Sequence, residues 1–287
     1  ATNSGFMERR EANHVPLTPL SFLSRVADIY PTRTAVVYGN LRYSWAEVHE
    51  RGVRLASALV KAGVKKGEVV TVMAPNLPAM FEAHFGVAMA GAVLNTLNTR
   101  LDISTIAYIL DHADTKILIS DTAFSATMRE AMEQSPNKSL TVIDIVDEQD
   151  ADSAAGQRLG EIDYENFIAG GDADYAWQMP TDEWAAMALN YTSGTSGRPK
   201  GVVYHHRGAY LMSMGTVPVW NMQMHPTYLY VVPMFHCNGW GHAWMMTLLA
   251  ATVICTRQLT AEAIFGLIET HKVTHFGGAP IILGMLV

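Results

Sequence analysis

Apolar segments that alternate with helical patterns are the feature of this sequence that most constrains its fold. Val69–Met73, Ile117–Ser120 and Leu140–Ile145 are short and largely apolar, and helical patterns such as Ser104–His112 lie between them. Strands that are apolar on both faces are typical of a parallel sheet covered by helices on both sides. The pattern therefore predicts an α/β fold.

The N-terminal part begins with a helix and a hairpin. Apolar residues from Leu20 to Ile29 follow a helical period that stops before Pro31. Residues 35–38 and 41–43 predict two strands joined at Gly39-Asn40. Ser44 and Glu47 have the spacing of a capping box, which predicts the start of the next helix.

The character of the chain changes after Val146. Residues 146–182 are acidic, small and glycine-rich, so we expect a surface insertion or linker there, with a subdomain boundary in 147–182. Alternation then resumes with strands at Ala186–Tyr191, Tyr228–Val232, Thr252–Cys255 and Thr274–Phe276, and with helices at Gly241–Leu249, Ala261–Glu269 and Ile281–Val287.

Charge and hydropathy exclude several classes of partner. The net charge is −7, and no cluster of Lys and Arg predicts a nucleic-acid or membrane surface. The apolar run Ala243–Cys255 is shorter than the ~20 residues that a bilayer requires, so it predicts a buried helix followed by a buried strand. The first 20 residues lack the apolar core of a secretory signal, and two unspaced cysteines, Cys237 and Cys255, suit reduced thiols in a cytoplasm.

The strand at Ala186–Tyr191 leads into a loop with the composition of a phosphate site. Its hydroxyl residues are Thr192, Ser193, Thr195 and Ser196, and its glycines are Gly194, Gly197 and Gly201. Glycines at positive φ let several backbone N–H groups converge on one anion, and hydroxyls add donors. Lys200 supplies a compact positive charge. A plain flexible turn would not explain this combination, so we interpret the loop as a phosphate cradle.

The spacing differs from that of kinase-type phosphate loops. Those loops end in Gly-Lys-Ser/Thr, whereas Lys200 lies between Pro199 and Gly201. The segment Tyr191-Thr-Ser-Gly-Thr-Ser-Gly-Arg-Pro-Lys-Gly-Val202 instead closely resembles the phosphate-loop motif of the adenylate-forming superfamily of acyl-CoA synthetases, peptide-synthetase adenylation domains and luciferases. The next motif of that superfamily resembles Val231-Val-Pro-Met-Phe-His-Cys-Asn-Gly-Trp240.

The resemblance extends over essentially the whole chain, through Tyr43-Ser-Trp-Ala-Glu47, Met73-Ala-Pro-Asn76 and Val273-Thr-His-Phe276. It implies that residues 1–287 are part of a large N-terminal domain that binds ATP and an acyl group, with sheets and helices in a layered αβαβα arrangement. Phe235-His-Cys-Asn-Gly-Trp240 is most similar to the short- and medium-chain acyl-CoA ligase branch, which includes methylmercaptopropionate-CoA ligases.

The resemblance also implies a reaction and its site residues. A carboxylate attacks the α-phosphorus of Mg-ATP, pyrophosphate leaves, and the CoA thiol then takes the acyl group from the adenylate. ATP, Mg²⁺ and CoA are thus the implied cofactors and co-substrates. The implied phosphate-binding residues are Thr192, Ser193, Gly194, Thr195, Ser196, Gly197 and Lys200, with Lys200 also catalytic and Thr192 near the metal.

The second motif implies an acyl pocket formed by His236, Asn238, Gly239 and Trp240, with His236 as a gate or catalytic positioning residue. If Phe235–Leu249 is one helix, His236 and Trp240 lie on one face of it. The alternative is that both are packed in the core.

Other metal chemistry has little support in the sequence. The histidines at 205, 206, 225, 236 and 242 lack the spacing of a zinc site, so Mg²⁺ arriving with ATP suffices. We expect Arg198 to point to solvent, and His205 and His206 either to line the mouth of the site or to cap the next helix. Several methionines near the proposed pocket are interpreted as core packing, with pocket lining as the alternative.

Members of the resembled superfamily continue beyond a segment of this length, with a magnesium-binding glutamate, a ribose-binding aspartate and a mobile lid domain that carries the adenylation lysine. None of these occurs here, so we expect a truncated protein that is inactive alone.

The expected activity of the intact protein is AMP-forming acyl-CoA ligation of a short- or medium-chain acid, with 3-(methylthio)propanoate as a candidate. The alternatives are an amino-acid or aryl-acid adenylation enzyme and an inactive nucleotide- or acyl-binding fragment. Monomer and homodimer both remain open.

Overall fold

The structure, a computed structural model, describes residues 8–192 and 197–287. Within these ranges most strands belong to a seven-stranded sheet in which neighbours run parallel, except that β9 runs antiparallel to β8. In spatial order this sheet consists of β7 (Ile162–Asp163), β6 (Thr141–Ile145), β5 (Thr115–Asp121), β3 (Val69–Met73), β4 (Val93–Thr96), β8 (Ala186–Thr192) and β9 (Lys200–His205). Every residue of β3 is buried, as its apolar sequence predicts.

The five-stranded sheet contains the predicted hairpin. Its order is β12 (His275–Phe276), β10 (Thr227–Leu229), β11 (Thr252–Ile254), β1 (Thr34–Tyr38) and β2 (Leu41–Ser44). Only β2 runs antiparallel to its neighbour among these strands, with Tyr38 opposite Leu41 and Gly39 at a φ of +51° in the turn. The turn therefore requires the left-handed conformation that glycine adopts readily.

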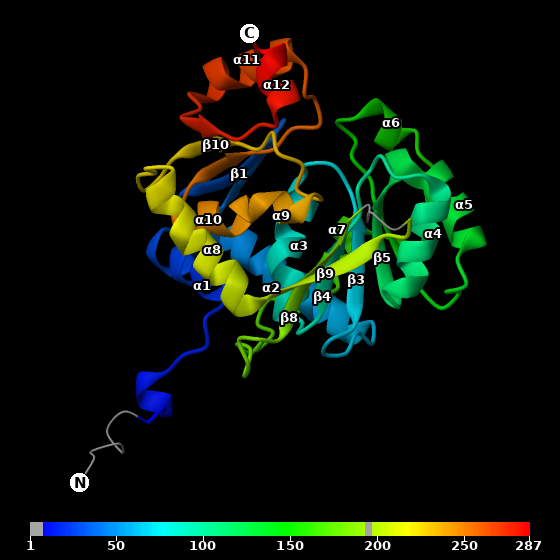
Figure 1. Ribbon diagram of the computed structural model, residues 1–287, viewed down its shortest axis with the longest axis horizontal. Helices are drawn as coiled ribbons and strands as arrows, with labels where there is room; N and C mark the ends of the chain where they lie inside the picture. The colour runs from blue at the N-terminus through cyan, green and yellow to red at the C-terminus, as the bar shows by residue number, and fades with distance from the viewer. Residues whose placement is uncertain (1–7, 193–196) are drawn as a thin grey trace.

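Helices separate and cover the two sheets, which gives the predicted αβαβα layering (Figure 1). Between the sheets lie α1 (Leu20–Ile29), α2 (Trp45–Lys61), α3 (Pro78–Met89) and α10 (His242–Leu248). Outside them lie α4 (Ile103–His112) and α5 (Ser125–Gln134) on the larger sheet, and α11 (Ala261–His271) and α12 (Pro280–Met285) on the smaller. The remaining helices are α6 (Ala151–Ala154), α7 (Tyr164–Ala169), α8 (His206–Val219), the short α9 (Cys237–Trp240), and the 3₁₀ turns Glu11–Asn13 and Thr122–Phe124.

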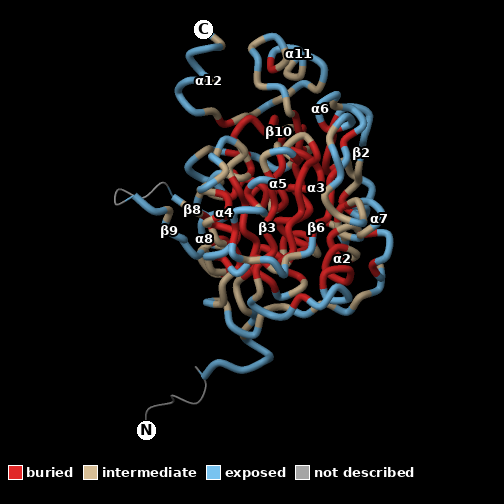
Figure 2. The backbone as a smooth tube through the Cα atoms, turned by 90° about the vertical axis from the view of Figure 1, so that its right-hand side faces the viewer, coloured by how far each residue is buried: buried red, intermediate tan, exposed pale blue. Residues whose placement is uncertain are grey.

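The central helix α3 is buried along its whole length (Figure 2), since it contacts strands of both sheets. Its polar side chains have buried partners. Glu82 accepts hydrogen bonds from Arg51 and Tyr164, and His84 pairs with the Met80 carbonyl oxygen at 2.7 Å. Polar residues in this helix thus fix its packing rather than mark an exposed face.

Local sequence signals at the helix ends are confirmed. The Ser44 hydroxyl accepts the Glu47 N–H at 3.3 Å, and the Glu47 carboxylate accepts the Ser44 N–H at 2.7 Å. Together these contacts form the capping box that starts α2. The run Ala243–Cys255 is the predicted buried helix followed by a buried strand. Among the helices that the structure describes, none combines the length and the apolar character needed to cross a bilayer.

The expectation of a surface insertion at 146–182 is wrong for its central part. β7 pairs with β6 and extends the larger sheet, and α7 buries Tyr164 and Ile168 against α2. The Tyr164 hydroxyl donates to Glu82 at 2.7 Å. Composition concealed this docking because two buried side chains suffice to anchor an otherwise polar segment. The subdomain boundary in 147–182 stays a prediction.

An ion cluster connects the two sheets. Arg257, which follows β11 of the smaller sheet, pairs with Asp121 at the end of β5 and with Asp147 after β6. Its Nε also contacts the Tyr38 hydroxyl at 3.1 Å, and Asp150 lies 3.8 Å from its Nη1. Because Asp121 is fully buried and Arg257 is only 12% exposed, this cluster joins the sheets in a region of low water access.

Candidate functional site

The described ends of the predicted phosphate loop belong to the β8–β9 hairpin. Thr192 pairs directly with Lys200, so both side chains lie on the same face of the hairpin. Both residues are exposed, and no ion pair joins Lys200 to a carboxylate in the parts of the chain that the structure describes. Its ammonium group is therefore available to an anion. The sequence did not predict that Lys200 begins a strand.

The predicted phosphate-binding residues Ser193, Gly194, Thr195 and Ser196 lie outside the described residues. Gly197 has a φ of +99° with open space around its Cα, which confirms the expected left-handed backbone there. The same expectation is wrong for Gly201, whose φ is not positive because it lies in β9 opposite Tyr191. A Cβ at Gly201 would lie 2.9 Å from Leu189 Cδ1, so this glycine supplies space instead.

Helix α4 supports the base of the hairpin. The Tyr191 hydroxyl and His112 Nδ1 are 2.8 Å apart, and the Arg198 guanidinium lies over the Tyr108 ring at 5.7 Å from its centroid. Burial raises the pKa of Tyr191 to about 12, so its hydroxyl stays protonated at neutral pH. Arg198 is exposed, as predicted, but one face of its guanidinium rests on an aromatic ring.

The second motif does not form the start of a right-handed helix. Cys237, Asn238, Gly239, Trp240 and Gly241 all have positive φ, between 48° and 66°. The expectation that His236 and Trp240 share one face of a helix Phe235–Leu249 is therefore wrong, since α10 begins only at His242. A left-handed turn is costly for L-residues, by roughly 1–2 kcal/mol each, so tertiary contacts must hold it.

The left-handed turn separates its residues into two layers. Asn238 is fully buried and Gly239 is buried above Tyr230, whose hydroxyl donates to the Gly239 carbonyl oxygen at 3.2 Å. Trp240 is 40% exposed, and His236 is exposed at the N-terminal end of the turn. Of the four predicted pocket residues, Trp240 thus faces a cavity, whereas Asn238 and Gly239 lie beneath it.

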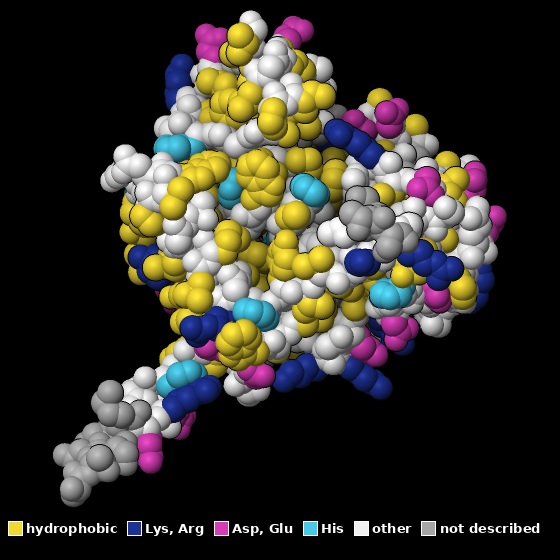
Figure 3. Space-filling model, in the orientation of Figure 1, with side chains coloured by type: hydrophobic (Ala, Val, Ile, Leu, Met, Phe, Trp, Pro, Cys, Tyr) yellow, Lys and Arg dark blue, Asp and Glu magenta, His cyan; other side chains and the backbone are white. Residues whose placement is uncertain are grey.

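That cavity has a volume of about 570 Å³ and lies between β9, α8 and the left-handed turn. Hydrophobic side chains gather over α8, α9 and α10 on the face shown in Figure 3. The residues that line the cavity are Val203, Tyr204, His205, Gly208, Ala209, Met212, Thr216, Trp220, Cys237, Trp240, His242 and Trp244. This set contains no Asp, Glu, Lys or Arg, so the cavity suits an uncharged, largely apolar group.

Strand β9 connects the two candidate subsites. Lys200 is at its start and Tyr204 is on the cavity wall, four residues along and therefore on the same face, about 13 Å away at the usual rise of a strand. His205 lines the cavity and also caps α8, because its Nδ1 accepts the Gly208 N–H at 2.8 Å. His205 therefore both caps the helix, as one interpretation expected, and lines the cavity. His206 does neither, because it is buried against Thr18.

On α8, the sequence left Met212 as an alternative pocket-lining methionine and did not identify Thr216 and Trp220. Met212, Thr216 and Trp220 are spaced four apart, which places them on one side of the helix axis. This spacing was the signal that could have identified them. Of the other methionines, Met222, Met234, Met245 and Met246 are buried in the core as interpreted, and Met214 and Met224 are exposed.

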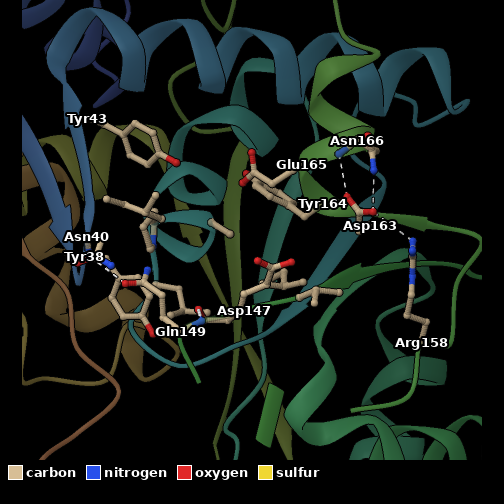
Figure 4. Close-up of a pocket in the computed structure, with 17 residues that line it drawn as sticks. Tyr38, Asn40, Tyr43, Asp147, Gln149, Arg158, Asp163, Tyr164, Glu165 and Asn166 are labelled. Carbon is tan, nitrogen blue, oxygen red and sulfur yellow. Dashed lines mark hydrogen bonds and ion pairs between the residues drawn. The ribbon is translucent and has the colours of Figure 1, made fainter. Parts of the chain in front are cut away.

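A second, larger cavity of about 770 Å³ lies where the β1–β2 hairpin faces the segment from Ile145 to Asn166 (Figure 4). Its lining is mixed: Leu41, Leu77 and Val146 contribute apolar surface, and Tyr38, Tyr43 and Asp147 face Tyr164 and Glu165 across it. We had not predicted it, because its residues come from separate segments and one of these was interpreted as a surface insertion. No residue of the predicted site lines it.

The described residues contain no group of three His, Cys, Asp or Glu side chains placed to share a metal ion. The Thr192 hydroxyl is an exposed oxygen at the end of β8, opposite Lys200. It is the type of ligand that Mg²⁺ accepts alongside phosphate oxygens and water. Thr192 therefore offers a suitable kind of ligand atom for a magnesium ion that arrives with a nucleotide.

Two layered sheets, with the exposed Thr192–Lys200 pair of the β8–β9 hairpin and an apolar cavity along the same hairpin, define the N-terminal α/β domain of the adenylate-forming class. The chain belongs to the AMP-binding enzyme family, which matches residues 23–287. The peroxisomal acetate/butyrate–CoA ligase of Arabidopsis thaliana is 45% identical over 284 residues, which cover 96% of this chain and 50% of that protein. The peroxisomal benzoate–CoA ligase of the same plant is 44% identical over 284 residues, covering 96% and 48%.

Among solved structures, the inhibitor-bound N-terminal domain of FACL13 from Mycobacterium tuberculosis is similar, with a TM-score of 0.81 and 24% identity. The match covers 94% of this chain and 65% of that one, and it shows the fold alone. The chain spans about half the length of the two plant relatives.

Proposed function

We propose that this chain supplies the ATP-phosphate loop and the acyl pocket of an AMP-forming acyl-CoA ligase. The observation that carries the proposal is the common strand β9. This strand has Lys200 at its start, with no carboxylate paired to it among the described residues, and Val203, Tyr204 and His205 of the cavity wall at its end, with Tyr204 on the same face as Lys200. An acid whose tail lies in the cavity would thus reach toward phosphates held at the hairpin tip.

In the proposed reaction, a carboxylate oxygen attacks the α-phosphorus of ATP, the bond to the bridging oxygen breaks, and pyrophosphate leaves. The CoA thiol then attacks the acyl carbonyl and AMP leaves. Both reactants of the first step are anions, so positioning and charge neutralisation provide most of the rate acceleration. Lys200 and the loop amides would neutralise the phosphates, and Thr192 would contact the magnesium that accompanies them.

The cavity favours a short or medium acid with an uncharged tail. It lacks charged side chains, and its volume of about 570 Å³ also accommodates an aromatic ring. The two plant relatives are named for acetate or butyrate and for benzoate, which fits both kinds of tail. Met212 and Cys237 on the wall would tolerate the thioether of 3-(methylthio)propanoate, which we keep as a specific candidate.

An amino-acid adenylation enzyme is the weaker alternative. Such an enzyme needs an acidic side chain against the substrate ammonium, and no Asp or Glu lines the cavity within the described residues. We keep the cytoplasm as the expected compartment; the two relatives are peroxisomal by name, which makes that organelle the alternative.

The test is carboxylate-dependent pyrophosphate exchange and CoA thioester formation by the full-length gene product. The acids would be acetate, butyrate, 3-(methylthio)propanoate, octanoate, benzoate and an amino acid. We expect exchange with at least one uncharged-tail acid and none with the amino acid. Absence of adenylate with every acid would refute the ligase proposal.

Lys200→Ala should lower kcat/KM for ATP by about 10- to 100-fold, the usual cost of losing a hydrogen bond to a charged group. The physical reason is that the Lys200 ammonium has no carboxylate partner to release and acts on the phosphates directly. The measurement is pyrophosphate exchange at varied ATP concentration. Arg198→Ala is the control, because that guanidinium rests on Tyr108 and should leave ATP kinetics unchanged. Equal effects of the two variants would remove Lys200 from the site.

Trp240→Ala should change acid preference by about 10-fold while the KM for ATP changes little, because it enlarges the cavity at one wall. The measurement compares kcat/KM for butyrate with that for octanoate. Phe265→Ala, an exposed aromatic on α11 far from the cavity lining, is the matched control. An unchanged preference would place Trp240 outside the acyl pocket.

A further inference from the structure

Buried amides link the phosphate-loop strand to the left-handed turn that carries Trp240. Asn190 lies on β8, two residues before Thr192, and Asn238 lies inside the turn. The Asn190 Nδ2 donates to the Asn238 Oδ1 at 2.7 Å, and both residues are buried. One hydrogen bond therefore connects the base of the phosphate hairpin to the base of the cavity wall.

This amide pair belongs to a longer buried network. The Asn238 Nδ2 lies 3.4 Å from His84 Nε2, and His84 Nδ1 is bonded to the Met80 carbonyl oxygen of α3. On the other side, the Thr96 hydroxyl is 3.2 Å from Asn190 Oδ1 and 2.8 Å from the Phe235 carbonyl oxygen. The turn is thus attached to β4, β8 and α3 through side chains rather than through its own backbone ladder.

The approach to the turn is fixed in the same way. The Asn76 Nδ2 donates to the Tyr230 and Val232 carbonyl oxygens at 2.7 and 3.0 Å, and its Oδ1 accepts the Met234 N–H at 2.8 Å. Asn76, from the loop after β3, therefore connects the segment that enters the turn to the larger sheet. Asn76 thus fixes the segment that enters the left-handed turn, and Asn238 fixes the middle of the turn.

Such contacts are needed because the turn is strained. Five successive residues have positive φ, including Cys237 and Trp240, whose Cβ atoms disfavour it. Backbone hydrogen bonds also close the turn, such as Gly239 N–H to the His236 carbonyl oxygen and Gly241 N–H to the Asn238 carbonyl oxygen, both at 2.9 Å, but they do not remove the strain of positive φ at residues with a Cβ. Without the buried amides, the turn would relax toward ordinary backbone angles and Trp240 would leave the cavity wall.

We propose that Asn190 and Asn238 are positioning residues whose amide pair sets where Trp240 lies relative to Thr192 and Lys200. The acyl pocket and the phosphate loop then keep one relative position, which an in-line attack by the carboxylate requires. This inference rests on the proposed ligase function. It adds residues that touch neither substrate, since Asn238 is fully buried and Asn190 is 5% exposed.

The test uses Asn190→Ala, Asn238→Gly and the double variant of the full-length gene product. Glycine at 238 keeps the preference for positive φ and removes only the amide. Each single variant should raise the KM for the acid about 10-fold and shift acid preference in the direction of Trp240→Ala, with a smaller effect on the KM for ATP. The effect of the double variant should be clearly smaller than the sum of the two single effects, because both substitutions remove the same hydrogen bond.

Asn95→Ala is the matched control. Asn95 is also buried in the larger sheet, but its Nδ2 donates to Thr71 Oγ1 at 3.0 Å, away from the turn. It should lower stability and leave acid preference unchanged. Additive effects of Asn190→Ala and Asn238→Gly, or a shift in preference with Asn95→Ala, would overturn the proposal.

Hydrogen exchange separates this inference from the ligase proposal. In the chain of 287 residues, Asn190→Ala should speed exchange at residues 237–241 and leave α10 protected, whereas Asn95→Ala should not. If the wild-type protein forms no adenylate, the ligase proposal fails while this measurement still decides the positioning role. Unchanged protection of residues 237–241 in Asn190→Ala would overturn it.

Discussion

Lowering the pH from about 7 to about 4 should unfold the described core, because three of its histidines are buried in the neutral form. Burial lowers the pKa of His84, His206 and His242 to about 4, from a usual value near 6.5. Each is at most 5% exposed. Their partners, the Met80 carbonyl oxygen, the Thr18 hydroxyl and the Tyr228 hydroxyl, are uncharged and do not offset a buried imidazolium.

The direction follows from proton binding. Between pH 6.5 and 4 the unfolded chain binds these protons and the folded chain does not, so stability is present above pH 6.5 and is lost as the pH falls toward 4. Each histidine contributes about 3 kcal/mol over that window, and the three together approach the ~5–15 kcal/mol that holds a domain folded. Urea midpoints at pH 7, 6, 5 and 4 measure the loss.

A variant identifies histidine as the cause. His242→Phe loses the contact to Tyr228, so it should be less stable at pH 7, but its stability should fall less steeply between pH 6.5 and 4. His14→Gln, in the N-terminal segment, should keep the wild-type slope. Equal slopes in His242→Phe and the wild type would contradict the explanation.

The parts of the fold that the sequence predicted well are those that local chemistry decides. The capping box at Ser44 and the hairpin at Gly39-Asn40 need only a few neighbouring residues to be specified. The buried strands β3 and β5 were found because strands covered on both faces are apolar throughout.

The turn at 237–241 was mispredicted because its conformation depends on distant residues. A spacing of four between His236 and Trp240 indicates one face of a helix only if the backbone is right-handed. Here the Asn190 amide, which is remote in sequence, and the Tyr230 hydroxyl on the strand side of the turn hold a left-handed backbone. A Cβ at Gly239 would lie 2.2 Å from the Tyr230 hydroxyl oxygen, so close packing demands glycine there. Periodicity contains no information about such contacts.

The site was predicted in its chemistry and less well in its geometry. Residue types identified the Thr192–Lys200 loop, because hydroxyls, glycines and a lysine on one loop suit phosphate. On α8, Met212 was kept only as an alternative pocket residue and Trp220 was not identified, since methionine and tryptophan are also ordinary core residues and only the folded chain brings them to Trp240. The ion cluster that connects the sheets was missed for a similar reason: Asp121, Asp147 and Arg257 are far apart in sequence.

Arg257→Met should lower the free energy of unfolding by about 3–5 kcal/mol, the usual cost of removing one partner from a buried ion pair. The substitution leaves Asp121, which is fully buried, and Asp147, which is 8% exposed, without their cation. Burial raises the pKa of Asp121 even with Arg257 beside it, so loss of water already outweighs the attraction. The measurement is urea unfolding at pH 7.

Two further variants give this prediction its contrast. Arg158→Met removes a 46% exposed arginine that lies 3.4 Å from Asp163 and 3.8 Å from the buried Asp144. Because this guanidinium is open to solvent and Asp144 keeps the N–H groups of Leu159 and Gly160 as donors, the loss should cost about 1 kcal/mol. Adding Asp121→Asn and Asp147→Asn to Arg257→Met removes the unpaired charges and should recover part of the loss. If Arg257→Met costs no more than Arg158→Met, the cluster does not clamp the sheets. If Arg257→Met costs more, the junction between the sheets is a polar contact. Its loss would also displace β11 and β10 of the smaller sheet. The Tyr230–Met234 segment, which leads into the turn carrying Trp240, would move with them.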